Sequence, residues 1–363
     1  MMASIVRPVV NIKNNMSMFT RNSQLILRRL TFNPLTRQCK YNSQSSEAAQ
    51  SIQEQNDPAP YFFNNEIQNI LRTITRPDPK KVFRTRKDGT KIYDPEYKFM
   101  TDEQLEKARK KSAEKCYEKL QMPPVLKQRP DIDRVFSKDP ELQGHDECRY
   151  VFTDITFGIN DSDRLIVVRD TDGKLREADW NERFRMNQIY FPTEGREIAT
   201  PKMFQQENLD VIIKKEEYEY ILDRACIQFE PNDPEYLRVT GSVYDAINNE
   251  KHFDKLLSTR HYGPLVFNLV WKKNIDSLLY DYIQKGNIDD ANLLVKLYHR
   301  VHPSSKSAEV VGNNDDPLGV IQSFIELDSS MRGKLQAILE SYKEIVISQK
   351  KLQEGIDKAH GRE

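Results

Sequence analysis

The alternation of apolar and polar residues that marks a β-strand is confined to one stretch of this 363-residue chain. It begins at "YVFTDITFGIN" (150–160) and continues through "RLIVVR" (164–169) and "KLREA" (174–178). The intervening "NDSD" and "DTDG" are rich in residues that favour turns. We therefore expect an antiparallel three-stranded meander at about residues 150–178.

The "DTDG" sequence also resembles the start of a calcium loop, which needs oxygen ligands at loop positions 1, 3, 5 and 12 and glycine at position 6. With Gly173 at position 6, Val168 falls at position 1, where no ligand oxygen is available. With Asp170 at position 1, Leu175 takes the place of the glycine. Neither register works, so Asp172-Gly173 is predicted to be a hairpin turn in which glycine supplies the positive φ.

Helical spacing dominates the remainder of the chain, so the predicted fold class is α+β and predominantly α-helical, with helices before and after the meander. Residues 63–74 carry apolar side chains on one narrow face. A charged helix is expected after Thr101, which can form a capping box with Gln104, and it should end before Pro123. It buries little by itself and is predicted to pack on a partner.

Further helices are indicated by their end signals. Asp179 is followed by Glu182 in a D-x-x-E capping pattern. Residues 274–302 read as a helical hairpin in which Gly286 ends the first helix. The chain should close with one long helix, from about Leu318 to Ile356.

Charge is unevenly distributed along the chain. Residues 1–46 contain seven basic residues and no acidic one, and the first acidic residue is Glu47. Such an arm is typical of a mitochondrial transit peptide, and the alternative is a disordered basic arm that binds nucleic acid. The remaining residues carry 48 basic and 55 acidic side chains, a net charge of −7. An acidic body of this kind contacts RNA only through local basic patches.

One basic segment stands out in this acidic body. Between Lys80 and Lys91 it carries six basic residues against one acidic residue, Asp88, with Phe83 and Tyr93 interleaved. Cations of this density suit phosphate contacts, and the aromatic rings can stack on bases. A solvated charged loop remains the alternative. The candidate RNA-binding residues are Lys80, Lys81, Phe83, Arg84, Arg86, Lys87 and Lys91.

Signatures of common enzymes are missing from the sequence. It has no P-loop, dinucleotide fingerprint, HExxH or GxSxG motif, and only 13 glycines. His145 and Cys148 have the spacing of a ligand pair but lack the second pair that zinc needs. His299 and His302 lie near a helix end, where cations complement the dipole and the last carbonyls. We therefore predict a protein that is not an enzyme, with no cofactor, metal, small-molecule substrate or membrane span.

These observations divide the chain into seven regions. They are a transit peptide (1–46), a disordered linker (47–60), an extended N-terminal region with two amphipathic helices and the basic segment (61–140), an α+β core with the meander (141–230), a helical region ending in the hairpin (231–303), a loop (304–317), and a C-terminal helix with a charged tail (318–363).

Eight motifs in order along the chain resemble one family, the twenty-second small-subunit ribosomal protein of mitochondria, which has no bacterial counterpart. They are "MPPVL" (122–126), "YVFTDI" (150–155), "RLIVVR" (164–169), "YFPTEGR" (190–196), "FQQENL" (204–209), "FEPNDPEY" (229–236), "LLSTRHYG" (256–263) and "LYHRVHP" (297–303). The resemblance covers about residues 60–350.

The resemblance implies a structural subunit of the small mitochondrial ribosomal particle in the matrix. It would contact small-subunit rRNA and neighbouring ribosomal proteins and support assembly and mitochondrial translation. The family brings no catalytic residues. The alternative is a helical assembly or translation factor that visits the particle transiently, and a third hypothesis is a matrix enzyme of unknown type.

Overall fold

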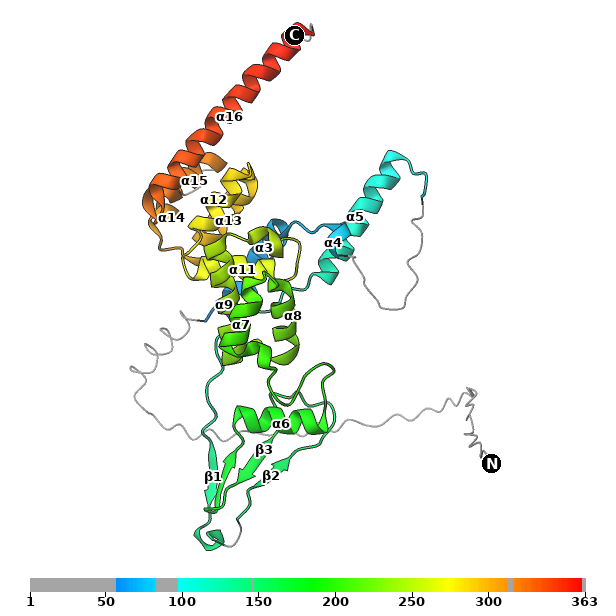
Figure 1. Ribbon diagram of the computed structural model, residues 1–363, viewed down its shortest axis with the longest axis vertical. Coiled ribbons are helices and arrows are strands. Elements are labelled where there is room, and N and C mark those ends of the chain that lie inside the picture. The colour runs from blue at the N-terminus through cyan, green and yellow to red at the C-terminus, as the bar shows by residue number, and fades with distance from the viewer. Residues whose placement is uncertain (1–56, 83–96, 145–146, 312–315, 361–363) are drawn as a thin grey trace, which may run out of the picture. The chain divides into compact units, whose positions relative to one another are not determined.

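The computed structural model describes residues 57–82, 97–144, 147–311 and 316–360, and all elements named below lie within them (Figure 1). The predicted transit peptide and all but residues 57–60 of the predicted linker lie outside these ranges. Within the described part, no helix is both long and apolar enough to cross a bilayer.

The β-signal of the sequence produces an antiparallel sheet, as expected. Strand β2 (Tyr150–Thr153) pairs with β3 (Ile166–Arg169), and β3 pairs with β4 (Lys174–Glu177). The turn between β3 and β4 is the predicted one, since Gly173 has a φ of +77°. The nitrogen of Gly173 donates to the carbonyl of Asp170, and the nitrogen of Asp170 donates to the carbonyl of Lys174. This is a hairpin loop with glycine at the left-handed position.

The predicted strand count of three is wrong, because a fourth strand completes the sheet. Strand β1 (Val135–Lys138) pairs antiparallel with β4, which gives the order β1-β4-β3-β2. All four residues of β1 are exposed, so they lack the alternation that marks a half-buried strand. Its partner lies more than thirty residues away in sequence, so no adjacent turn signal reveals the pairing.

One face of the sheet is covered by helix α6 (Trp180–Tyr190), as Figure 1 shows. Both hydrogen bonds of the predicted capping box between Asp179 and Glu182 are present. Ile166, Val168 and Ala178 are fully buried beneath the helix and contact Met186. These contacts give the sheet a small hydrophobic core of its own.

The main core is helical and gathers apolar side chains from both ends of the described chain. Helix α11 (Tyr262–Trp271) lies at its centre and is buried along nearly its whole length. Helix α3 (Asn65–Thr75) packs on α11, and the ring of Phe62 meets that of Phe267 edge-on. Around them lie η2 (Lys202–Phe204), α7 (Gln206–Lys214), α8 (Tyr218–Gln228), α9 (Pro234–Glu250) and α10 (Phe253–Leu256).

The predicted helical hairpin is confirmed as α12 (Asp276–Gln284) and α13 (Ile288–Val301). Gly286 has a φ of +74°, and its nitrogen donates to the carbonyl of Ile283. The nitrogen of Asn287 donates to the carbonyl of Tyr282, which completes a Schellman motif.

The C-terminal part departs from the single long helix that the sequence suggested. It consists of α15 (Pro317–Leu327) and α16 (Arg332–Ala359), separated by residues 328–331. Helix α14 (Lys306–Val311) precedes them. The break has a polar cause, because Asp328 accepts hydrogen bonds from the nitrogen and hydroxyl of Ser307, and Asp276 accepts bonds from Ser330 and Met331.

The N-terminal part contains α2 (Ala59–Phe62), α3, α4 (Pro79–Val82) and α5 (Asp102–Lys119). The capping box of Thr101 and Gln104 is confirmed at the start of α5. Cys116 is the only fully buried residue of α5, and α5 packs on α4. The remaining short element is η1 (Pro140–Leu142).

Candidate functional site

The basic segment begins where α4 is held against the helical core. The ammonium group of Lys81 donates to the carbonyl oxygens of Leu257 at 2.5 Å and Lys255 at 3.3 Å. This cation therefore anchors the start of the segment. Lys80 also lies in α4, and the other candidates, Phe83, Arg84, Arg86, Lys87 and Lys91, fall outside the described residues.

A sharp turn at Arg76 brings this segment onto the core. Arg76 ends α3 in the left-handed conformation, with a φ of 46°. Its carbonyl accepts a hydrogen bond from the hydroxyl of Ser258 at 2.5 Å, and the nitrogen of Ser258 donates to the carbonyl of Thr75 at 3.2 Å. Ser258 itself has a φ of +64°. The left-handed turn at Arg76, before the basic segment, is therefore hydrogen-bonded to the left-handed turn at Ser258, before α11.

The side chain of Arg76 fixes the same turn to the helical hairpin. Its Nε lies 2.7 Å from Oδ2 of Asp290, and its Nη1 donates to Oδ1 of Asn287 at 3.2 Å. The Asp290 side chain is only 6% exposed, whereas that of Arg76 is 47% exposed. Burial raises the pKa of the Asp290 carboxyl, and Arg76 opposes the rise. The chain gave no local signal for this pair, because its members are more than two hundred residues apart.

Replacing Arg76 with methionine should destabilise the protein by about 2 kcal/mol at pH 7, because it leaves a buried carboxylate without its partner. Because about half of the Arg76 side chain is exposed to solvent, the loss of stability should be smaller than for a fully buried ion pair. Below about pH 3.9, the ordinary pKa of aspartate, the carboxyl is protonated in both folded and unfolded states. Because the folded pKa is raised further in the variant, the loss should grow as pH rises from about 4 toward neutrality. Denaturant unfolding across this range measures it.

The matched control is the double substitution Arg76→Met with Asp290→Asn. It removes the charge that arginine neutralises, so most of the lost stability should return at pH 7. A loss in R76M that is equally large at pH 4 and pH 7 would contradict this account.

The far end of the basic segment leads into α5. Residues 97–100 have no regular structure, and the rings of Tyr97 and Phe99 are almost fully exposed. Helix α5 presents exposed cations among its acidic residues, including Lys107, Arg109 and Lys111. Helix α4 packs on α5, and the charge of Asp78, just before α4, acts on Cys116 near the C-terminus of α5. The start of the basic segment therefore lies beside the C-terminal part of α5, whereas residues 97–100 lead into its N-terminus.

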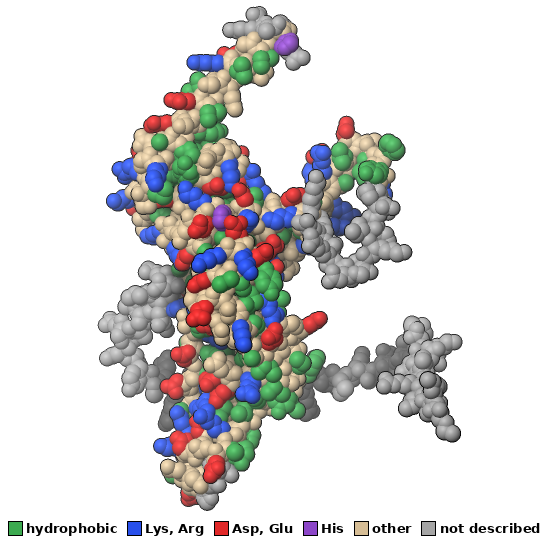
Figure 2. All heavy atoms as spheres, viewed as in Figure 1, with side chains coloured by type: hydrophobic (Ala, Val, Ile, Leu, Met, Phe, Trp, Pro, Cys, Tyr) green, Lys and Arg blue, Asp and Glu red, His purple; other side chains and the backbone are tan. Residues whose placement is uncertain are grey.

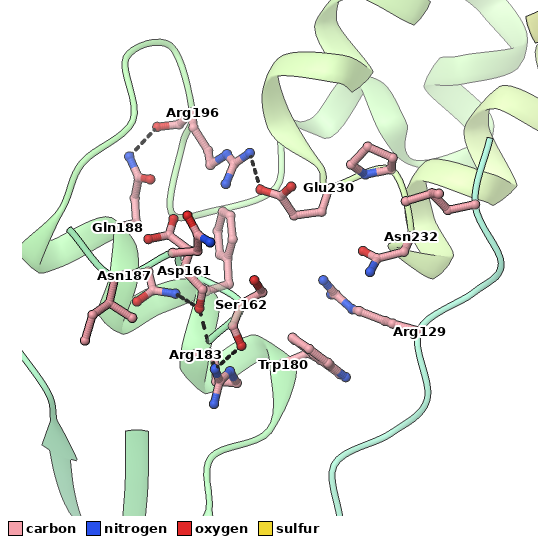
Figure 3. A pocket seen from close by; sticks show the side chains of 15 residues that line it. Arg129, Asp161, Ser162, Trp180, Arg183, Asn187, Gln188, Arg196, Glu230 and Asn232 are labelled. Carbon is pink, nitrogen blue, oxygen red and sulfur yellow. Dashed lines mark hydrogen bonds and ion pairs between the residues drawn. The ribbon is translucent and has the colours of Figure 1, made fainter. Parts of the chain in front are cut away.

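A second candidate is a cavity of about 560 Å³ between the α6 region and the α8–α9 connection (Figure 3). Its lining comes from five separate stretches of the chain, which explains why no sequence motif indicated it. The residues labelled in Figure 3 are Arg129, Asp161, Ser162, Trp180, Arg183, Asn187, Gln188, Arg196, Glu230 and Asn232.

Each arginine of this cavity is already bound to a carboxylate. Arg129 contacts Asp233 at 2.5 Å, Arg183 contacts Glu177 at 3.1 Å and Arg196 contacts Glu230 at 2.8 Å. The guanidinium of Arg129 also stacks on the Trp180 ring, 4.4 Å from its centroid. The Nε atoms of Arg129 and Arg183 and Oδ1 of Asn187 are buried without partners among the described residues. The polar groups that line this cavity can hydrogen-bond to ordered water. Because they come from both the α6 region and the α8–α9 connection, the ion pairs between them connect the sheet region to the helices.

The histidines singled out from the sequence have structural partners. Nε2 of His299 lies 2.8 Å from the hydroxyl of Ser307, and Nε2 of His302 lies 2.9 Å from the carbonyl of Val270. Burial lowers the pKa of both rings. They therefore bind neighbouring segments and do not contact the last carbonyls of their own helix. Among the described residues no group of three or more His, Cys, Asp or Glu side chains is placed to hold a metal ion; Cys148 is exposed and His145 lies outside them.

Comparison with known proteins identifies relatives over most of the chain. The model of the family named mitochondrial 28S ribosomal protein S22 matches residues 60–303. The small ribosomal subunit protein mS22 of Mus musculus is 40% identical over 305 residues, which is 84% of each chain. That of Bos taurus is 40% identical over 290 residues, 80% of each chain.

Proposed function

Since this chain belongs to the family of the mitochondrial 28S ribosomal protein S22, we propose that it is a structural component of the small subunit of the mitochondrial ribosome. The observation that carries this proposal is 40% identity to small-subunit proteins over most of both chains. The protein is located in the mitochondrion, and its role is structural and not enzymatic. The paired arginines of the cavity agree with this role, because they bind segments of the chain to one another.

Sedimentation of mitochondrial ribosomes on a gradient tests the proposal. The chain should track with the small particle and remain there after a high-salt wash, because a built-in subunit buries contacts that salt does not screen. A transient assembly or translation factor would leave in the wash. Confinement of the chain to light fractions would refute both. The hairpin of α12 and α13 resembles one unit of a helical repeat, but no second copy at a fixed period supports the transient factor.

Contact with small-subunit rRNA is assigned to the basic segment, residues 80–91. Lys81 and Arg76 hold its start on the core, and α5, which packs on α4, carries further exposed cations. This arrangement supports a phosphate-binding surface on an otherwise acidic body, because clustered cations displace the counterions of RNA. Lys81 serves as an anchor in this proposal, and Lys80, Phe83, Arg84, Arg86, Lys87 and Lys91 serve as the contact residues.

Reversal of three of these charges, Arg84→Glu, Arg86→Glu and Lys87→Glu, should lower incorporation into the small particle by about tenfold or more at physiological salt. Quantitative blotting of gradient fractions measures the loss. The control reverses three exposed lysines on α16, Lys334, Lys350 and Lys351, and changes the net charge equally. The variant should melt like the unmodified chain. Normal incorporation of the first variant would show that the segment is merely solvated.

A further inference from the structure

Strand β2 is an open edge of the sheet. It pairs only with β3 among the described strands, and the nitrogen of Asp154 donates to the carbonyl of Leu165 just beyond the paired residues. Alternate residues of an antiparallel pair bond to each other. The register opposes Phe152 to Val167, so Phe152 bonds to β3 as Asp154 does. The backbone N–H and C=O groups of Val151 and Thr153 therefore point away from the sheet, where an added strand would bind.

The face of the sheet opposite α6 carries apolar side chains along this edge. Ile166 and Val168 point toward α6, so Leu165 and Val167 point the other way, as does Phe152 opposite Val167. Phe152 is 57% exposed and Leu165 is 51% exposed. Figure 2 shows hydrophobic side chains gathered at the surface beside β2. The edge thus offers both backbone groups and an apolar surface.

The opposite edge is protected in a way that β2 is not. Strand β1 carries an irregularity between Val135 and Ser137, where its register against β4 shifts. A bulge of this kind twists an edge and hinders the pairing of another strand. The ladder between β2 and β3 has no such shift.

The charges around this edge favour a basic partner. Between residues 147 and 179 there are eight acidic and five basic side chains. Arg164 is buried. Ion pairs join Arg176 to Asp170 and Glu182 and join Arg183 to Glu177, so these charges largely offset one another, and the acidic excess comes from the other carboxylates. Asp154 follows β2 directly, and hydrogen bonds from Thr156 lower its pKa, so it stays ionised. RNA phosphates would be repelled here, whereas lysine and arginine side chains would be attracted.

We propose that β2 is the docking edge for an extended segment of a neighbouring protein, in which apolar residues alternate with lysine or arginine. The segment adds as a fifth strand. Its backbone bonds to Val151 and Thr153, its apolar side chains cover Phe152 and Leu165, and its cations are attracted by the excess of acidic residues around the edge. This inference deepens the proposed function, since it assigns one of the protein contacts of a ribosomal subunit to a defined surface.

A fluorescent eight-residue peptide of alternating valine and lysine, titrated into the purified full-length chain, tests this edge directly. Anisotropy should report binding that weakens as salt rises, and a matched valine–glutamate peptide should not bind. Hydrogen exchange followed by mass spectrometry should slow at residues 149–155 in the presence of the valine–lysine peptide. Val151→Pro removes an outward N–H without breaking the β2–β3 ladder, so it should weaken binding at least about tenfold.

The matched control, Val151→Thr, keeps the N–H and the β-branched shape and should bind within about twofold of the unmodified chain. If V151P lowers the melting temperature, Phe152→Lys provides the second variant, because it places a like charge against the lysine-rich peptide. Equal binding by V151P and V151T, or binding of a labelled oligouridine at the same residues, would overturn the proposal. Particle sedimentation is a separate readout, so failure of the docking edge is distinguishable from failure of the ribosomal assignment.

Discussion

Substitution of Gly173 by alanine is expected to loosen the four-stranded sheet and to lower stability by about 2–4 kcal/mol. Two costs combine at this position. A φ of +77° strains any residue with a Cβ, and a Cβ here would lie 2.0 Å from the carbonyl oxygen of Asp139. The nitrogen of Asp139 donates to the carbonyl of Gly173, so relief of the clash must pull β1 away from the hairpin. Hydrogen exchange at residues 135–138 and 174–177 should accelerate.

Gly158 offers a matched control for this prediction. Its φ is +88°, but nothing lies within 4 Å of the position its Cβ would take. Gly158→Ala therefore carries only the backbone strain, about 1 kcal/mol. Equal effects of G173A and G158A on unfolding and exchange would show that the close approach of β1 contributes nothing.

These two glycines illustrate which parts of the fold could be predicted from the sequence. The Asp172-Gly173 turn and the capping boxes at Thr101 and Asp179 were predicted because every interacting residue lies within a few positions. Strand β1 was missed because its residues are exposed and its partner is distant. The close approach of the Asp139 carbonyl, which leaves no room for a Cβ at Gly173, therefore could not be predicted from the residues near Gly173 in sequence.

The candidate site likewise has features that the local sequence indicated and others that depend on residues far apart in the chain. Charge density alone indicated the basic segment, since six cations within twelve residues stand out in the acidic part of the chain that follows residue 46. Nothing in the sequence indicated that Lys81 anchors the segment or that Arg76 pairs with Asp290, because these contacts join residues far apart in the chain. A three-stranded meander already places its first strand, here β2, at an edge; what stayed hidden is that β1 pairs with β4 and forms the opposite edge.

Substitution of Asp276 by alanine should have the second large effect, a loss of about 2–3 kcal/mol centred on the start of α16. The side chain lies in the first turn of α12 and is almost fully buried. Its Oδ2 accepts bonds from the nitrogen and hydroxyl of Ser330 at 2.9 and 2.5 Å, and from the nitrogen of Met331 at 3.2 Å. One carboxylate therefore fixes the break between α15 and α16, and its negative charge also suits the N-terminus of α12.

Hydrogen exchange and denaturant unfolding distinguish this role from simple packing. In D276A, exchange should accelerate over residues 329–342, because the first turns of α16 lose their polar attachment while Leu335 and Leu339 keep their apolar contacts with the core. Ser330→Ala removes only the hydroxyl bond and should cost about 1 kcal/mol or less. If D276A and S330A destabilise the chain equally, then the two backbone donors do not depend on Asp276. The break in the C-terminal helix would then follow from the local sequence of residues 328–331 alone, since no distant carboxylate would be needed to hold it.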